Sequence, residues 1–265
     1  MNIQRWFKSC LDKQDMVLVT GSTSGIGLEY AKAFAALGRN LVCISNESDA
    51  LKKQKAQFEQ EFGIKVLSFD VDLRDVKATQ RVAEEAAKLP IGLLVNNAGF
   101  GLKGVFEKNA VESYIDIISV NVTAPVIFTR AILPNMQKAR RGGIIHVASI
   151  NALVPIPGNQ VYTATKAFIY SYASAVAREN KGTPLCFQLV LPGTTKTPFH
   201  ERQGAVPTHM TMMPEDVVKA SLKNMRHGIC IPNRADSVLA YIVPMLPLNW
   251  AMDMAAYLLK KRLGV

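Results

Sequence analysis

The stretch Asp15-Met16-Val17-Leu18-Val19-Thr20-Gly21-Ser22-Thr23-Ser24-Gly25-Ile26-Gly27 joins a short apolar run to three closely spaced glycines. The run to Thr20 predicts a buried strand, and the amphipathic pattern that follows, to about Leu37, predicts a helix. This order places free backbone N–H groups and the positive end of a helix dipole where a phosphate can bind. The glycine spacing is G-x-x-x-G-x-G, which differs from the G-x-G-x-x-G dinucleotide fingerprint. The loop alone is therefore compatible with a simple turn or with a phosphate site.

The rest of the chain alternates between strands and helices. Further strands are expected at 40–45, 64–69, 91–95, 143–148, 184–191 and 228–231. Helices are expected at 48–62, 75–88, 112–138 with an interruption near Pro125, around Tyr162 to about Glu179, and from Pro214 to about Arg226. Strands this rich in Val, Ile and Leu favour a parallel sheet with helices on both faces. The predicted fold class is α/β, a doubly wound parallel sheet.

The composition indicates one globular domain with a basic surface. The chain has 265 residues, 49% of them apolar and 20% charged, with no linker, repeat or low-complexity tract. The net charge is +10, but the basic residues are spread in short clusters without interleaved aromatics, which disfavours nucleic-acid binding. A solvated surface that helps an anionic cofactor or a lipid to bind is the better interpretation.

The four cysteines are scattered and have neither C-x-x-C nor metal-ligand spacing. We therefore expect no disulfide and no metal site. The apolar stretch within residues 1–15 is too broken for a signal peptide. A reducing, cytoplasmic compartment is the expected location.

Several polar features follow the expected strands. They are the 21–27 loop, Asp72, 96–99, Ser149 and 192–197. The carboxyl ends of parallel strands meet at one edge of a sheet, and ligands of such folds bind there. The sequence therefore predicts one site at this edge.

A serine, a tyrosine and a lysine stand at informative separations in this region. Tyr162 and Lys166 are four apart, so they share one face of a helix, and Ser149 ends the preceding strand. A phenol titrates near about 10, and to exchange a proton at neutral pH it needs about 4 kcal/mol of support for the phenolate. A neighbouring ammonium can supply much of that support, and a serine hydroxyl can hold a substrate oxygen. Without the rest of the sequence, a solvated Tyr and Lys pair would be the simpler interpretation.

With these residues in view, the chain resembles the classical short-chain dehydrogenase/reductase (SDR) family. The resemblance runs from about Asp15 to Ile231 in the order and spacing of that family. Its motifs are Thr20-Gly21-x-x-x-Gly25-Ile26-Gly27, Asp72-Leu73 with Asp75, Asn96-Asn97-Ala98-Gly99, Asn121-Val122, Ser149, Tyr162-x-x-x-Lys166, and Pro192-Gly193 followed by Thr197. The resemblance implies a Rossmann-like sheet of about seven strands and hydride transfer between a nicotinamide and a carbonyl or alcohol carbon.

The family's residues carry over onto matching positions of this chain. The resemblance implies that Tyr162 is the general acid/base and that Ser149 positions the carbonyl oxygen. It implies that Lys166 binds the nicotinamide ribose and depresses the tyrosine pKa, and that Asn121 helps to hold a water path to Lys166. The implied cofactor-binding residues are Gly21, Ser22, Ser24, Ile26, Gly27, Asn46, Asp72, Leu73, Asn97, Ala98, Gly99, Pro192, Gly193, Thr195 and Thr197, with Tyr162 and Lys166.

The choice between NAD and NADP is less strongly indicated. An acidic residue after the second strand binds the 2′-hydroxyl of NAD, and a basic residue favours the 2′-phosphate of NADP. Here the strand ends in Ser45 and Asn46, and Ser24 in the loop is also neutral. Glu47 follows directly and could reach the ribose. We favour NADP slightly over NAD.

Apolar residues surround the expected site and fill the end of the chain. The segments after Gly99 and Ser149 and the region 199–213 are mostly apolar, which favours a lipophilic carbonyl or alcohol substrate. We expect residues 1–235 to form one catalytic domain and residues 236–265 an apolar tail. The tail's longest uncharged run, 237–252, is 16 residues and contains prolines, so it is too short and broken for a confident spanning helix. Three interpretations remain open for it, in decreasing order of support: packing on the domain or a dimer mate, peripheral membrane contact, and a membrane span.

Two alternatives to an active oxidoreductase remain open. One is a catalytically silent dinucleotide-binding sensor or scaffold. The other is an SDR-type epimerase or dehydratase that uses the same tyrosine and lysine. The resemblance also implies a homodimer or homotetramer through the helices that carry Asn121 and Tyr162.

Overall fold

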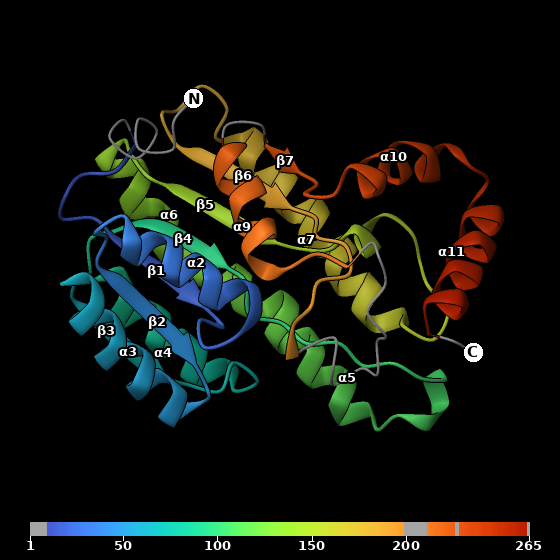
Figure 1. Ribbon diagram of the computed structural model, residues 1–265, viewed down its shortest axis with the longest axis horizontal. Helices are drawn as coiled ribbons and strands as arrows, with labels where there is room; N and C mark the ends of the chain where they lie inside the picture. Colours follow the sequence, from blue (N-terminus) through green and yellow to red (C-terminus); the bar gives the residue numbers. More distant parts are fainter. Residues whose placement is uncertain (1–9, 199–210, 226–227, 264–265) are drawn as a thin grey trace.

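A computed structural model describes residues 10–198, 211–225 and 228–263, and its centre is a parallel sheet of seven strands. The strand order is β3-β2-β1-β4-β5-β6-β7, and every neighbouring pair is parallel (Figure 1). The strands are β1 Met16–Thr20, β2 Leu41–Ser45, β3 Val66–Asp70, β4 Ile91–Asn96, β5 Gly143–Val147, β6 Cys186–Val190 and β7 Ile229–Cys230. The chain order reverses between β1 and β4, so the crevice outside their carboxyl ends is the ligand position of a doubly wound fold.

Helices cover both faces of this sheet, as the apolar strand runs predicted. Val17 and Val19 point to one face and Leu18 to the other, and all three are fully buried. On the first face, α2 Gly25–Ala36, α3 Ser48–Phe62 and α9 Pro214–Lys223 contribute to one core cluster. On the second face, α4 Val76–Ala87 and α6 Ala124–Ala139 build another, and α7 Gln160–Glu179 packs beside them against β6. The predicted fold class and the approximate strand count are confirmed.

The long helical region differs in detail from its expected form. It consists of α5 Val111–Ile118, a π-helical turn Ser119–Thr123 and α6, without a break. The interruption expected near Pro125 takes the form of this π-helical turn, which ends two residues before Pro125. Pro125 has no N–H to donate to the preceding turn of this continuous helix. The π-turn contains Asn121, and such turns are frequent at functional sites. Among the described residues, 111–139 is the helix long and apolar enough to cross a membrane, and half of its apolar window is buried inside the protein.

The end of the chain is helical. It forms α10 Arg234–Ile242, a 3-10 turn Val243–Met245 and α11 Leu248–Leu263, which lie to one side of the sheet and its covering helices (Figure 1). Asp236 at the start of α10 is buried against Gly193, where an added Cβ would collide with the aspartate carboxylate. This contact fastens α10 to the loop that follows β6.

Candidate active site

The glycine loop is built for close backbone approach. Gly21 and Gly25 have φ angles of 65° and 54°, a region that side chains disfavour. Gly27 lies in the first turn of α2, and a Cβ there would collide with the Gly21 carbonyl oxygen and the Asn97 side chain. The loop thus leaves a cradle that side chains would fill, at a helix N-terminus whose N–H groups favour anions. These residues fit the pyrophosphate of a dinucleotide.

Thr20 and Asn97 join this loop to the turn after β4. The backbone N–H groups of Asn97 and Ala98 both donate to Thr20 Oγ1 at 3.0 Å. The Asn97 amide in turn donates to the carbonyl oxygens of Thr20 at 3.0 Å and Gly21 at 3.2 Å. Sequence reasoning missed this role of Thr20, because a threonine at a strand end has no local signal for a partner more than seventy residues away.

A cavity of about 420 Å³ lies beyond the loop, on the side expected for adenosine. The residues predicted to bind there and found in its lining are Gly21, Ser24, Asn46, Asp72, Leu73, Ala98 and Gly99. Glu47 also lines it, and its carboxylate accepts a hydrogen bond of 2.6 Å from Thr23. Arg74 was not predicted and lines the cavity as well; its guanidinium binds both oxygens of Asp72, which holds the pKa of Asp72 below its usual value.

Ser149, Tyr162 and Lys166 meet around a second, smaller cavity of about 150 Å³. The other predicted residues in its lining are Gly21, Ser24, Ile26, Asn97, Ala98, Gly99, Pro192, Gly193, Thr195 and Thr197. Ser149 follows β5, whereas Tyr162 and Lys166 share the buried face of α7. Lys166 Nζ lies 5.8 Å from the centre of the Tyr162 ring and donates to the Val147 carbonyl oxygen at 3.1 Å.

Burial controls the acidity of the tyrosine and the lysine. It raises the pKa of Tyr162 to about 12, although a hydrogen bond with Ser149 acts in the opposite direction. It lowers the pKa of Lys166 to about 8. The sequence predicts a more acidic tyrosine than this, because spacing reveals the lysine but not the desolvation of the phenol. At neutral pH the phenol is protonated and can donate a hydrogen bond and a proton.

Asn121 supports the backbone beside this cavity. Its side chain makes a pair of hydrogen bonds with the backbone of Phe100, at 3.0 and 2.9 Å, and donates to Thr165 at 3.1 Å. A Cβ on Gly99 would meet Asn121 Oδ1 at 3.0 Å and Lys166 Nζ at 3.4 Å. Asn121 thus reaches the Lys166 region across the turn that lines both cavities.

Two predicted positions need separate comment. Ser22 is fully buried, and its hydroxyl donates to Gln54 of α3 at 3.1 Å, so its side chain faces away from both cavities. The Gln54 amide in turn donates to the Ser22 carbonyl oxygen at 2.6 Å, and this pair of hydrogen bonds orients the loop. Most of the substrate segment expected at 199–213, namely 199–210, lies outside the described residues.

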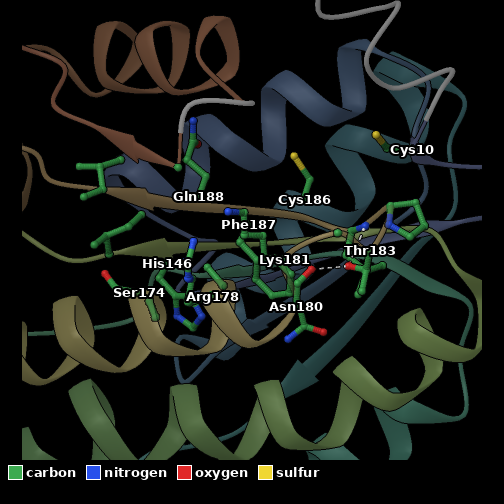
Figure 2. Close-up of a pocket in the computed structure, with 18 residues that line it drawn as sticks. Cys10, His146, Ser174, Arg178, Asn180, Lys181, Thr183, Cys186, Phe187 and Gln188 are labelled. Carbon is green, nitrogen blue, oxygen red and sulfur yellow. Dashed lines mark hydrogen bonds between the residues drawn. The ribbon is translucent and has the colours of Figure 1, made fainter.

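A larger cavity of about 640 Å³ lies elsewhere, along the C-terminal part of α7 and the start of β6 (Figure 2). His146 of β5 is in its lining and is 2% exposed. Its Nδ1 lies 3.4 Å from the Asn96 amide nitrogen, and its Nε2 has no hydrogen-bond partner among the described residues. Burial lowers the pKa of His146 to about 4, so the imidazole is neutral at physiological pH.

His146 should make folding sensitive to mild acid. The ordinary pKa of a histidine is 6.5, so between pH 6.5 and pH 4 the unfolded chain binds a proton at His146 that the folded chain does not. The contribution of neutral His146 to the free energy of unfolding is fully present above pH 6.5. It is lost as the pH drops towards 4, which lowers the free energy of unfolding by up to about 3 kcal/mol. We expect His146→Asn to flatten this slope in urea unfolding at pH 7 and pH 5. An equal loss in the variant and the wild type would contradict the assignment.

The fold and the two adjoining cavities are of the Rossmann type that suits a dinucleotide, and the sequence places the chain in a family. The chain belongs to the short chain dehydrogenase family, whose model matches residues 15–206. It is an NAD(P)H-dependent oxidoreductase.

Individual relatives extend this likeness over most of the chain. A short chain dehydrogenase of Pseudocercospora fijiensis is 31% identical over 85% of this chain and 74% of its own length. A very-long-chain 3-oxoacyl-CoA reductase of Bos taurus is 28% identical over 80% of this chain and 68% of its own. Among solved structures, a short-chain dehydrogenase from Sphingobium yanoikuyae in complex with NADPH has a TM-score of 0.77 and 29% identity, over 87% of this chain and 94% of that chain.

Proposed function

We propose that this enzyme is an NADP-dependent reductase of a lipophilic carbonyl compound, with Tyr162 as the general acid. The observation that carries the proposal is the meeting of Ser149, Tyr162 and Lys166 in one cavity that also reaches the glycine loop. Residues 1–235 form the catalytic domain in this proposal.

The proposed mechanism assigns one task to each residue. A nicotinamide held by the glycine loop and Lys166 would supply the hydride. The Ser149 hydroxyl donates a hydrogen bond to the substrate carbonyl oxygen and positions it beside the Tyr162 hydroxyl. The phenol, protonated at neutral pH, then donates its proton to the oxygen as negative charge develops there. Lys166, cationic below its pKa of about 8, stabilises the phenolate that remains.

NADP is the proposed cofactor because β2 ends in neutral side chains and Arg74 lines the adenosine-side cavity. Glu47 opposes this choice, because its carboxylate lies in the same cavity and would repel the 2′-phosphate of NADP. The relative that was solved with NADPH supports the assignment.

We expect Glu47→Gln to strengthen NADPH binding. The change removes a negative charge near the proposed 2′-phosphate but keeps the side-chain length and a partner for Thr23. An effect of about 1 kcal/mol, or roughly fivefold in Kd, is reasonable for one partly screened charge. Fluorescence titration with NADPH and NADH measures it. Glu85→Gln, which changes an exposed glutamate of α4, is the control. An equal change for both nucleotides would contradict the assignment of Glu47 to the 2′ position.

The proposed substrate has a long or bulky apolar part. The loop after Ser149 is apolar, and with α7 and Met252 of α11 it lines a cavity of about 420 Å³. The name of the Bos taurus relative, a very-long-chain 3-oxoacyl-CoA reductase, supports a fatty-acyl substrate class.

The proposal includes a homodimer or homotetramer in the cytoplasm, with peripheral membrane contact by residues 236–265. Helix α5 exposes Val111, Ile115 and Ile118, at a spacing that places them along one face, and α7 exposes Phe168. These apolar side chains support self-association through the helices that carry Asn121 and Tyr162. Light scattering of an Ile115→Asp variant, compared with the wild type, tests it.

The activity test follows absorbance of the reduced nicotinamide with NADPH and then NADH, against fatty 3-oxoacyl thioesters, steroid ketones and aliphatic aldehydes. Turnover with at least one of them is the expected result. Tight nucleotide binding without turnover across the panel favours a sensor. A converted substrate whose redox level is unchanged points to an epimerase or dehydratase.

A further inference from the structure

The two C-terminal helices expose an unusual number of large apolar side chains. We define the tail surface as the exposed apolar residues of α10, the 3-10 turn and α11. They are Val238, Ile242, Met245, Leu248, Trp250 and Tyr257. Met245 is 84% exposed and Trp250 68%, values that leave most of each side chain in water. Exposed apolar groups this closely spaced mark an interaction surface.

The tail surface is attached to the body of the protein. On α11, Ala251 is buried and Met252 lines the apolar cavity next to α7. On α10, buried Asp236 packs against Gly193. Each of the two helices therefore packs on the protein with one side, and the exposed residues lie on the other side of a packed helix.

The chemistry of this surface fits the interface of an anionic bilayer. The run from 237 to 252 contains no charged residue, and Lys260-Lys261-Arg262 follow it in the last turns of α11, on a chain of net charge +10. Exposed Asp253 is the one acidic side chain between the run and this cluster. Tryptophan and tyrosine concentrate at the membrane interface, and basic residues near it attract anionic lipid. Trp250 and Tyr257 are seven apart on α11 and therefore share one face.

The geometry favours a helix pair that lies on a bilayer over one that spans it. The turn Val243–Met245 divides the uncharged run between two helices, and α10 has only 9 residues. Spanning takes about 20 consecutive apolar residues. Amphipathic helices with interfacial aromatics instead bury their apolar side chains in the headgroup boundary.

A second copy of the chain is the rival occupant of the tail surface. The exposed apolar residues of α5 and α7 lie on other helices and already provide a surface of the kind that subunits bury. The α5 and α7 surface lacks the combination that the tail offers, an exposed tryptophan followed by the basic cluster Lys260-Lys261-Arg262.

We propose that α10, the 3-10 turn and α11 dock the enzyme on the surface of an anionic phospholipid bilayer. This docking rests on the peripheral membrane contact included in the proposed function and specifies its lipid class, whereas it does not depend on reductase activity.

Vesicle sedimentation tests the proposal with the full-length protein. Vesicles of phosphatidylcholine with about one quarter phosphatidylglycerol are compared with pure phosphatidylcholine. We expect preferential binding to the anionic vesicles, and a partition coefficient roughly tenfold lower for the Met245→Ser/Leu248→Ser/Trp250→Ser variant. The matched control is Val111→Ser/Ile115→Ser, which removes side chains that are 61% and 57% exposed on α5 and should leave vesicle binding unchanged. Thermal melting of both variants shows whether they fold.

A spectroscopic measurement gives a second readout. The chain has two tryptophans, so in a Trp6→Phe background Trp250 is the reporter. Its emission should shift to the blue when anionic vesicles are added, because the indole leaves water. The proposal is overturned if the folded triple variant binds vesicles as the wild type does, or if Trp250 emission does not respond. It is also overturned if the triple variant changes the oligomeric state while the wild type binds no vesicles.

Discussion

Tyr162→Phe is expected to lower kcat by roughly three orders of magnitude while leaving nucleotide binding nearly unchanged. The substitution keeps the ring and removes only the hydroxyl, which is the proton donor in the proposed mechanism. Phenylalanine has no proton to give, and Ser149 alone would leave the developing negative charge with one hydrogen bond. The residues of the adenosine-side cavity are untouched, so affinity for NADPH should persist.

Tyr30→Phe is the matched control for this change. Tyr30 is fully buried in α2, and its hydroxyl donates to Ser221 of α9 at 2.5 Å, in the core on the first face of the sheet. Loss of that hydrogen bond should cost about 1 kcal/mol of stability and leave kcat in place. Steady-state kinetics and nucleotide titration separate the two variants. A Tyr162→Phe enzyme that keeps more than a tenth of its kcat would exclude Tyr162 as the general acid.

Gly27→Ala should nearly abolish nucleotide binding. The new Cβ would collide with the backbone carbonyl of Gly21 and the Asn97 amide. A backbone carbonyl cannot yield as a flexible side chain can, so the loop itself must move. That movement breaks the hydrogen bonds of Asn97 to Thr20 and Gly21. We expect a loss of about 2 to 3 kcal/mol of stability and a Kd for NADPH that rises about a hundredfold or more, since 1.4 kcal/mol corresponds to a factor of ten.

Gly38→Ala provides the comparison. Gly38 has a φ of 70°, and no atom lies within 4 Å of the position of its Cβ. Alanine there should cost about 1 kcal/mol through backbone strain alone. Its nucleotide affinity should equal that of the wild type. Isothermal titration with NADPH and urea unfolding measure both quantities, and equal nucleotide affinity for the Gly27 and Gly38 variants would refute the role of the loop.

The architecture could be predicted because its signals are local and redundant. Each central strand is a continuous apolar run, and the helices between them show amphipathic patterns, so the alternation indicated a parallel sheet covered on both faces. The candidate site followed from the same logic, since loops after parallel strands meet at one edge. Tyr162 and Lys166 share a helix, so their spacing alone placed them on one face.

Other features depended on contacts between distant parts of the chain. Thr20 fastens the glycine loop to the turn after β4, whereas Ser22, next but one to it, turns towards Gln54. The pairing of Asp72 with Arg74 and the π-turn at Asn121 had no clear signal in the residue pattern. Side-chain direction in a loop depends on which neighbours fold against it, and composition does not encode this.

The sequence by itself determined the doubly wound sheet, the edge that carries the site and the residue types available for proton transfer, because strand and helix periodicities are short-range properties. Tertiary structure alone decided the state of those residues. Burial makes the Tyr162 phenol a neutral donor with a pKa of about 12 and lowers that of Lys166 to about 8. Tertiary structure also decided that α10 and α11 each pack on the protein with one side and leave the tail surface exposed. Desolvation and exposure are properties of the packed molecule, because they depend on every element that surrounds a group.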